Sequence, residues 1–213
     1  MYSSASSIGF AMMTAASAVL PWVLPGRAQA GDEDFQPIIE AEMPERFPAY
    51  TPVGEVRVKH YPAYRKAETG ASRGSAFWTL FSHIKQNGVA MTAPVEMTYT
   101  DRRPSREATM AFLYGTADTG EAGRQGRVEV VDAPAITALS TGVRGPRTDD
   151  AVAKARARLD TWLENNGERY VSAGPMRVMA YNSPFIPRDR NYFEVEIPIR
   201  PLAADESGPD SHP

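Results

Sequence analysis

Histidine is the residue type in this sequence best suited to act as a metal ligand or proton acceptor near neutral pH. The chain has three, His60, His83 and His212, and no cysteine. Without cysteine, disulfides, thiolate catalysis, zinc fingers and iron–sulfur clusters are all excluded. The histidines are far apart, and no metalloprotease, nucleophile-elbow, P-loop or dinucleotide-binding motif accompanies them. The sequence therefore predicts binding rather than catalysis, although residues distant in sequence can still meet in space.

The three histidines differ in their expected surroundings. His60 continues the alternation of Val56 and Val58, so we expect it to point inward as a hydrogen-bonded core residue. His83 lies off the centre of a predicted helix's apolar stripe, so we expect it to stand outside the core. There it is either a solvated surface residue or a ligand. His212 belongs to a polar tail and is not a candidate.

The bulk composition fits one globular domain with tails. The chain has 213 residues, of which 42% are hydrophobic and 23% charged, with a net charge of −3. That is enough apolar material for a sizeable core. No cluster of lysine and arginine is present that could displace counterions from a nucleic acid, so we expect no nucleic-acid partner.

Residues 1–30 have the composition of an export signal. They contain one charged side chain, Arg27, and an apolar or small-residue run over residues 8–24. They end in Ala28-Gln29-Ala30, a pattern that signal peptidase cleaves. The alternative is an uncleaved membrane anchor, which the shortness of the run and two nearby prolines disfavour. We expect a periplasmic or secreted protein without a stable membrane anchor after cleavage.

Three further segments follow the signal. Residues 31–52 are acidic and proline-rich without clear periodicity, and are interpreted as an extended N-terminal arm. Residues 53–201 carry regular helix and strand patterns and form the predicted domain. Residues 202–213 are polar and are predicted to be a disordered tail.

Two segments of the domain have apolar residues at helical spacing. The first is residues 75–87, with Ser75 as its cap and Asn87-Gly88 as its end. The second is residues 149–166, with Thr148 as its N-cap. The two apolar stripes consist of Phe77, Leu80, Phe81 and Ile84, and of Val152, Ala155, Leu159, Trp162 and Leu163.

Alternation with period two predicts half-buried strands elsewhere. The longest run covers residues 89–99, with Met91 and Met97 on its apolar side and Glu96 on its polar side. Shorter runs cover residues 110–114 and 193–199. In the last run the polar alternates, Glu194 and Glu196, are expected to face outward.

Small landmarks recur in the same order along the domain and predict an internal repeat. Pro62-Ala63 corresponds to Pro134-Ala135, and Asn87-Gly88 to Asn166-Gly167. The predicted fold class is α+β, with two pseudo-symmetric strand-helix-strand-strand halves that share a curved sheet and two flanking helices. A cleft between the halves is a natural ligand site.

Several strings of this sequence resemble the SOUL heme-binding family. The most specific is Val89-Ala90-Met91-Thr92-Ala93-Pro94-Val95, which is similar to the family's signature strand. The resemblance covers residues 53–199 and implies a distorted β-barrel flanked by two helices, with non-covalent heme as the cofactor. Other strings resemble the opening strand, a late aromatic–proline turn and the closing strand: Glu55-Val56-Arg57, Tyr61-Pro62-Ala63, Tyr181-Asn182-Ser183-Pro184-Phe185 and Arg190-Asn191-Tyr192-Phe193-Glu194-Val195.

The resemblance also implies that the first helix forms the porphyrin site. Because its apolar stripe takes the core side, we expect the exposed side of this helix to bound a shallow open pocket. His83 is then the candidate axial ligand of the iron. Trp78 either stacks on a tetrapyrrole or widens the buried face of the helix. The candidate partners of the propionates, or else ordinary surface charges, are Arg73, Lys85, Arg188 and Arg190.

Three functions remain open at this point. The first is reversible heme or tetrapyrrole binding outside the cytoplasm, for buffering, scavenging or delivery. The second is an effector-type module that binds another amphipathic or cationic small molecule in the same cleft, with Glu96 as a weak candidate contact. The third is a hydrolase, which a convergent acid–base pair would favour.

Overall fold

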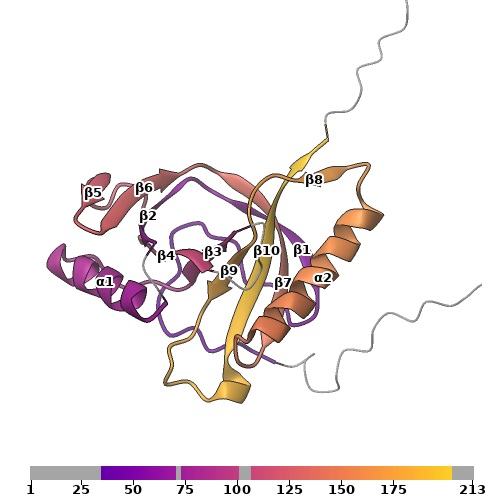
Figure 1. Ribbon diagram of the computed structural model, residues 1–213, viewed down its shortest axis with the longest axis horizontal. Coiled ribbons are helices and arrows are strands. Elements are labelled where there is room, and N and C mark those ends of the chain that lie inside the picture. Colours follow the sequence, from indigo (N-terminus) through magenta and orange to yellow (C-terminus); the bar gives the residue numbers. More distant parts are fainter. Residues whose placement is uncertain (1–34, 71–72, 101–106, 203–213) are drawn as a thin grey trace, which may run out of the picture.

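Two amphipathic helices flank the sheet, close to the ranges that the apolar stripes predict. The computed structural model describes residues 35–70, 73–100 and 107–202 (Figure 1). Helix α1 is Arg73–Gln86 and helix α2 is Asp149–Asn165. The Thr148 hydroxyl caps α2 as predicted, accepting a hydrogen bond from Ala151 N at 3.1 Å. Helix α1 begins before Ser75, so the predicted cap is wrong there, whereas Gly88 ends it with a positive φ of 66°.

The strands form one antiparallel sheet. Its hydrogen-bonded order is β1-β7-β10-β9-β3-β4-β2-β6-β5, and β8 also pairs with β10. A short 3-10 helix, η1 (Arg188–Arg190), precedes the last strand. The strands are β1 (Val56–Tyr61), β2 (Tyr64–Thr69), β3 (Val95–Tyr99), β4 (Glu107–Leu113), β5 (Gly123–Gln125), β6 (Val128–Ala133), β7 (Ile136–Arg144), β8 (Tyr170–Ser172), β9 (Arg177–Ala180) and β10 (Tyr192–Pro201).

The two halves of the chain have a similar order of elements. The first runs β1, β2, α1, β3, β4 and the second runs β6, β7, α2, β9, β10, with the strand order symmetric about the β9–β3 pair. Each half has two strands before its helix, not the single one predicted, because the chain bends at Pro62-Ala63 and at Pro134-Ala135. Whether the halves superpose stays a prediction.

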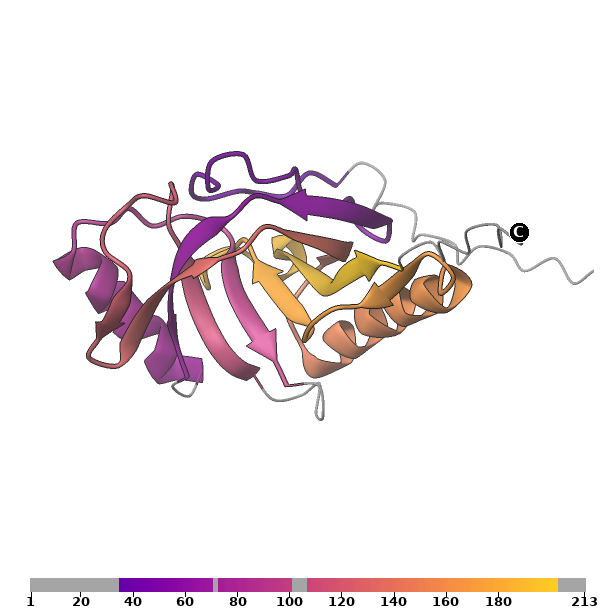
Figure 2. The ribbon, with the colours of Figure 1, turned by 90° about the horizontal axis from the view of Figure 1, so that it is seen from above.

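The two bent segments pair with each other through both bends. One register continues from Val56↔Thr141 to Tyr61↔Ile136 and Tyr64↔Ala133. The sheet is strongly curved in consequence (Figure 2). Its hydrogen-bonded path nevertheless runs from β1 to β5 without closing. The α+β class with a large antiparallel sheet and two helices holds, and the predicted barrel is not confirmed.

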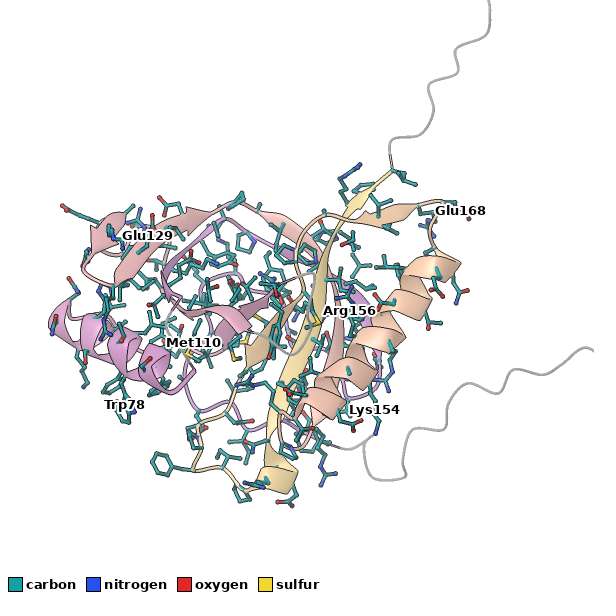
Figure 3. The ribbon with its side chains drawn as sticks, viewed as in Figure 1. Trp78, Met110, Glu129, Lys154, Arg156 and Glu168 are labelled. Carbon is teal, nitrogen blue, oxygen red and sulfur yellow. The ribbon has the colours of Figure 1, made fainter. Side chains whose placement is uncertain are left out.

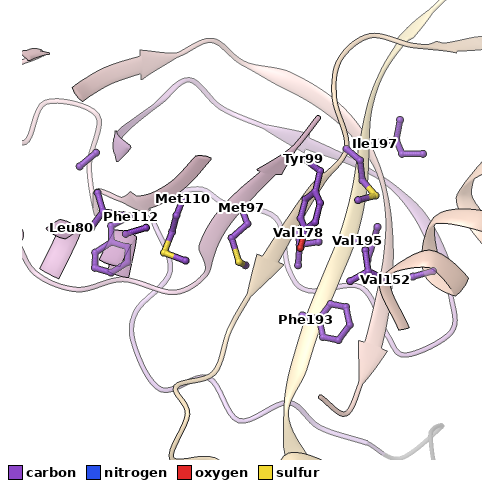
Figure 4. Packing of buried hydrophobic residues seen from close by; sticks show 14 of the residues in the cluster. Leu80, Met97, Tyr99, Met110, Phe112, Val152, Val178, Phe193, Val195 and Ile197 are labelled. Atoms are coloured by element: carbon purple, nitrogen blue, oxygen red, sulfur yellow. The ribbon is translucent and has the colours of Figure 1, made fainter. Parts of the chain in front are cut away.

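The two faces of the sheet are covered by different parts of the chain. Figure 2 shows α1 and α2 on one side and the arm, here residues 35–52, on the other. The helix side is apolar, and Figure 4 shows how its core packs. Strand β10 turns Phe193, Val195 and Ile197 toward this core. The side chains in between face the arm.

Two strand predictions fail, the first because the sheet is buried on both faces. Glu194 and Glu196 are not on an outward face; each is 0% exposed. The strand predicted over residues 89–99 starts only at Val95. Before it, the Ala93 N–H bonds to the Glu42 carbonyl of the arm at 3.0 Å rather than to a neighbouring strand, and the Ala93–Pro94 peptide is cis.

The predictions for the ends of the chain lie largely outside the described residues. The predicted signal peptide lies wholly outside them, as does the predicted tail apart from Leu202. Among the residues that are described, no helix is both long and apolar enough to cross a membrane.

Candidate functional site

The outer face of α1 presents an aromatic ring to solvent. Trp78 is 66% exposed and projects from the helix (Figure 3). Its ring stands perpendicular to those of Phe77 and Phe81, with centroids 5.4 and 5.9 Å away, and these contacts hold it in place. Widening of the buried face is thus excluded for Trp78. Stacking on a ligand stays a prediction.

A cation lies on the same surface. Lys85 Nζ is 5.7 Å from the centroid of the Phe81 ring, close enough for a cation–π contact. Helix α1 contains no Asp or Glu, so no carboxylate of the helix competes with an anionic ligand group for Lys85. We call Trp78, Phe81 and Lys85 the α1 outer surface. It combines an apolar plane with a positive charge at its rim.

His83 does not belong to this surface, and its predicted outward position is wrong. It is 6% exposed, and its Nε2 lies 2.8 Å from Tyr114 Oη. The Asn87 side-chain amide is 3.3 Å from its Nδ1. Burial lowers the pKa of the imidazole below its ordinary value of 6.5. The buried arc of α1 is wider than its apolar stripe because Tyr114, which follows β4, packs against the helix flank.

Among the described contacts, none places the other predicted cations next to Trp78. Arg190 lies 5.9 Å from the centroid of the Phe35 ring and so contacts the arm. Arg188 is exposed on η1. Nothing is described of the Arg73 side chain, although Arg73 begins α1. Lys85 alone of the four predicted cations is seen next to the aromatic surface.

The inward, buried position predicted for His60 is also wrong, although the predicted alternation of its strand is right. His60 is exposed, with Nδ1 3.0 Å from Thr137 Oγ1, whereas its neighbour Lys59 is 5% exposed. Val56 and Val58 pack toward the helices, and Lys59 and Tyr61 face the arm. The side that carries Lys59 and Tyr61 is thus buried as well, whereas His60, near the end of β1, is exposed.

The face beneath the arm holds an ionic cluster that the sequence patterns did not reveal. We define it as Lys59, Lys66, Glu96, Arg177, Glu194 and Glu196. Glu96 accepts from Lys66 Nζ at 2.6 Å and from Arg177 Nη1 at 3.1 Å. Glu196 accepts from Arg177 Nε at 2.8 Å. Lys59 Nζ donates to both oxygens of Glu194 at 2.9 Å. Three cations therefore balance three carboxylates.

Tyrosine hydroxyls complete the hydrogen bonding of these carboxylates. Tyr64 donates to Glu96 at 2.7 Å, Tyr61 to Glu196 at 2.5 Å and Tyr181 to Glu194 at 2.6 Å. Burial, and then the neighbouring glutamates, raise the pKa of all three phenols far above the ordinary value. The hydroxyls therefore stay protonated and act as donors.

The Glu96 carboxyl stays ionised in spite of its burial. Burial alone raises the pKa of Glu96, but Arg177 and Lys66 outweigh it, so the pKa of this carboxyl lies below its ordinary value. Such a cluster is costly to desolvate and is weak evidence for stability on its own.

The arm seals this face. Phe47 contacts the rings of Tyr61 and Tyr64 edge-on, with centroids 5.0 and 5.2 Å away. Thr51 N donates to Glu194 at 2.5 Å. A Cβ at Gly142 would lie 2.1 Å from the Thr51 carbonyl oxygen, so only glycine allows the arm to approach β7 this closely.

No cluster of three or more His, Asp or Glu side chains suited to a metal ion occurs in the described ranges. The described residues thus contain two separate candidate sites. The α1 outer surface is exposed, aromatic and cationic, whereas the ionic cluster is charge-balanced and covered by the arm.

Comparison with known proteins gives a family and a fold. Residues 46–198 match the family model described as SOUL heme-binding protein. No curated protein matches the chain. Among solved structures, the C-terminal domain of EcmrR has a TM-score of 0.54 at 20% identity, covering 70% of this chain and 98% of that one. An uncharacterized conserved protein and a hydrolase, both from Listeria innocua, have TM-scores of 0.52 and 0.51 at 12% identity. Each covers 71% of this chain, and 95% and 94% of their own chains respectively. At such identities these structures share the fold.

Proposed function

Because the chain belongs to the SOUL heme-binding protein family, we propose that it binds heme or another tetrapyrrole on the α1 outer surface, reversibly and without catalysis. The observation that carries this proposal is Trp78, a large aromatic side chain held by two ring contacts yet 66% exposed. Leaving an indole in water forgoes the stabilisation that burial provides. A flat aromatic ligand would recover it by stacking.

The charges of α1 fit the anionic edge of such a ligand. Lys85 lies beside Phe81, and the helix carries no carboxylate. A propionate near Lys85 would form a charge-assisted contact. Trp78 and Phe81 would then orient the macrocycle, while Lys85 would fix which edge faces the end of the helix.

The residues present do not fit axial ligation of the iron by His83. Both ring nitrogens already have partners, Tyr114 and Asn87, and the ring is buried. Ligation would require the 2.8 Å contact with Tyr114 to break. We therefore propose that affinity comes from the macrocycle and its carboxylates, and that binding is modest and exchangeable, as suits buffering, scavenging or delivery.

Titrations with hemin and with iron-free protoporphyrin IX test this proposal. Soret absorbance and tryptophan fluorescence are followed as each is added to the purified chain. We expect saturation at a single site for both, with affinities that agree within about a factor of three, since no iron ligand contributes. Absence of saturable binding for either compound overturns the proposal. Much tighter hemin binding, with a Soret band that moves in His83→Gln, overturns the ligand-free assignment.

We propose further that the protein works outside the cytoplasm. The support is the composition of residues 1–30, which ends in Ala28-Gln29-Ala30. Mass spectrometry of the natively produced protein tests it. A mature chain that begins at Gly31 is expected, and retention of Met1 in the native protein contradicts it.

The alternatives gain no support from the ionic cluster. Each of its carboxylates is paired with a lysine or arginine, so the cluster offers no uncompensated negative charge to a cationic ligand. The arm also separates these carboxylates from solvent. A hydrolytic acid–base pair would need access to water and substrate.

A further inference from the structure

A second exposed aromatic side chain lies far along the chain from α1. Phe185, in the loop between β9 and β10, is 93% exposed, the highest value among the large hydrophobic side chains of the described residues. Exposed prolines, Pro184 and Pro187, flank it. Ile38 of the arm, whose carbonyl the loop contacts through Asn182, is also exposed, at 36%. We call residues 184–187 the apolar tip.

Hydrogen bonds connect the base of this tip to the arm. Asn182 Nδ2 donates to the Ile38 carbonyl at 2.5 Å, and Ser183 donates to the Glu40 carboxylate through N at 2.6 Å and Oγ at 2.9 Å. The turn itself is closed by Ile186 N to the Ser183 carbonyl at 3.3 Å. A preordered tip loses little conformational entropy when it docks, so its rigid display of Phe185 favours binding of a partner.

Arginines lie next to the base of the tip. Arg188 and Arg190 follow it directly and are exposed, with Asp189 as the acidic residue between them. Arg144 joins them, because its Nε donates to the Asp189 carbonyl at 2.8 Å. The carboxylate of Glu40 is already occupied by Ser183. Three arginines therefore accompany two carboxylates, Asp189 and Glu40, at the base of the tip, which leaves a net positive charge there.

We propose that this tip docks the protein on an anionic lipid surface. Phe185 would enter the boundary between headgroups and acyl chains, and the arginines would remain among the lipid phosphates. A single aromatic with a few arginines gives weak, reversible adsorption, unlike a membrane-spanning anchor. Protruding from the protein, Phe185 is shaped to enter a fluid layer rather than to fill a flat interface between proteins.

The test is co-flotation of the purified chain with vesicles. Vesicles of phosphatidylcholine mixed with phosphatidylglycerol are compared with vesicles of phosphatidylcholine alone. We expect binding to the mixed vesicles that weakens as salt rises, because added ions screen the arginines. Phe185→Ala should lower the partition coefficient about tenfold, and Arg188→Glu by a similar factor. Phe185→Trp should retain binding, and its emission should be quenched further by brominated lipids than that of the parent.

Lys154→Glu on α2 is the matched control for Arg188→Glu, since both replace an exposed cation with a carboxylate. It should leave vesicle binding unchanged. Equal flotation of the parent and Phe185→Ala overturns the proposal, as does equal binding of the parent to both kinds of vesicle. If neither vesicle binds, the lipid assignment is wrong. The hemin titration is expected to be unaffected by Phe185→Ala, so this proposal and the tetrapyrrole proposal can fail separately.

Discussion

Helices α1 and α2 occupy corresponding places in the two halves of the molecule, yet their outer faces differ. Both bury small and branched apolar residues against the sheet, such as Leu80 and Leu159 at 0% exposure. Both end with an asparagine whose side chain donates to the carbonyl four residues earlier, from Asn87 to His83 and from Asn166 to Trp162. The inner faces and the C-terminal ends of the two helices are thus alike.

The outer faces of the two helices carry different side chains. Helix α2 presents ion pairs to water, Lys154 with Asp150 and Arg156 with Asp160 (Figure 3). Helix α1 presents Trp78 and Lys85 and has no carboxylate. Because the scaffold requires only the inner faces, the difference between the outer faces points to function, and α2 serves as an internal control for α1.

The largest effects are expected on the inner faces, where the helices should behave alike. Leu80→Ala and Leu159→Ala each leave a cavity in the core, so each should lower the free energy of unfolding by about 2–5 kcal/mol. Denaturant titration measures both. If one change costs less than about 1 kcal/mol, the helices are not equivalent as scaffold elements.

A smaller effect, the pH dependence of stability, should come from His83 at the end of α1 and not from the end of α2. Burial lowers the pKa of His83, so below pH 6.5 the unfolded chain takes up a proton that the folded protein resists. Stability should therefore be fully present above pH 6.5 and fall as the pH drops toward the folded-state pKa. His83→Gln should remove this slope while losing about 1 kcal/mol at neutral pH. Thermal melts from pH 7.5 down to about pH 5 measure it.

Two controls sharpen this pH experiment. His60→Gln changes an exposed histidine, and Trp162→Phe changes the residue that corresponds to His83 on α2. Both should keep the slope of the parent protein. A slope that persists in His83→Gln but disappears in His60→Gln would contradict the assignment.

The smallest effects are expected from the exposed lysines. Lys154→Ala removes an i,i+4 ion pair and should cost about 0.3–0.5 kcal/mol of stability, with no change in hemin affinity. Lys85→Ala should leave stability nearly unchanged and weaken hemin binding by about three- to tenfold. Denaturant and hemin titrations of both variants measure this. Equal hemin affinity in the two variants contradicts the role of Lys85.

The sequence predicted the features that depend on local periodicity. Both helices, the Thr148 cap and the strands β4 and β10 follow from apolar spacing and end signals. Helical spacing also placed Trp78 at the edge of the apolar stripe, where the structure exposes it.

The remaining features depend on which segment covers each face. A pattern that alternates Glu194 with apolar neighbours is typical of a strand with one wet side, but the arm makes that side dry. Lys59 is buried for the same reason, whereas His60 on the opposite side of β1 is exposed. His83 is buried by Tyr114, a residue from another element, which a helical wheel does not represent. The ionic cluster joins residues from both halves of the chain, so no local motif announces it.

The central claim is that Trp78 makes the α1 outer surface the tetrapyrrole site, and transfer of the indole between the helices tests it most directly. Ala157 precedes Asn166 by the same interval as Trp78 precedes Asn87, and it is exposed on α2. Hemin titrations compare the parent with Trp78→Ala, Trp78→Phe and Trp78→Ala combined with Ala157→Trp. We expect Trp78→Ala to weaken binding about tenfold, Trp78→Phe to retain most of it, and the indole on α2 to restore none of it. Unchanged affinity in Trp78→Ala, or full recovery through Ala157→Trp, would contradict the claim.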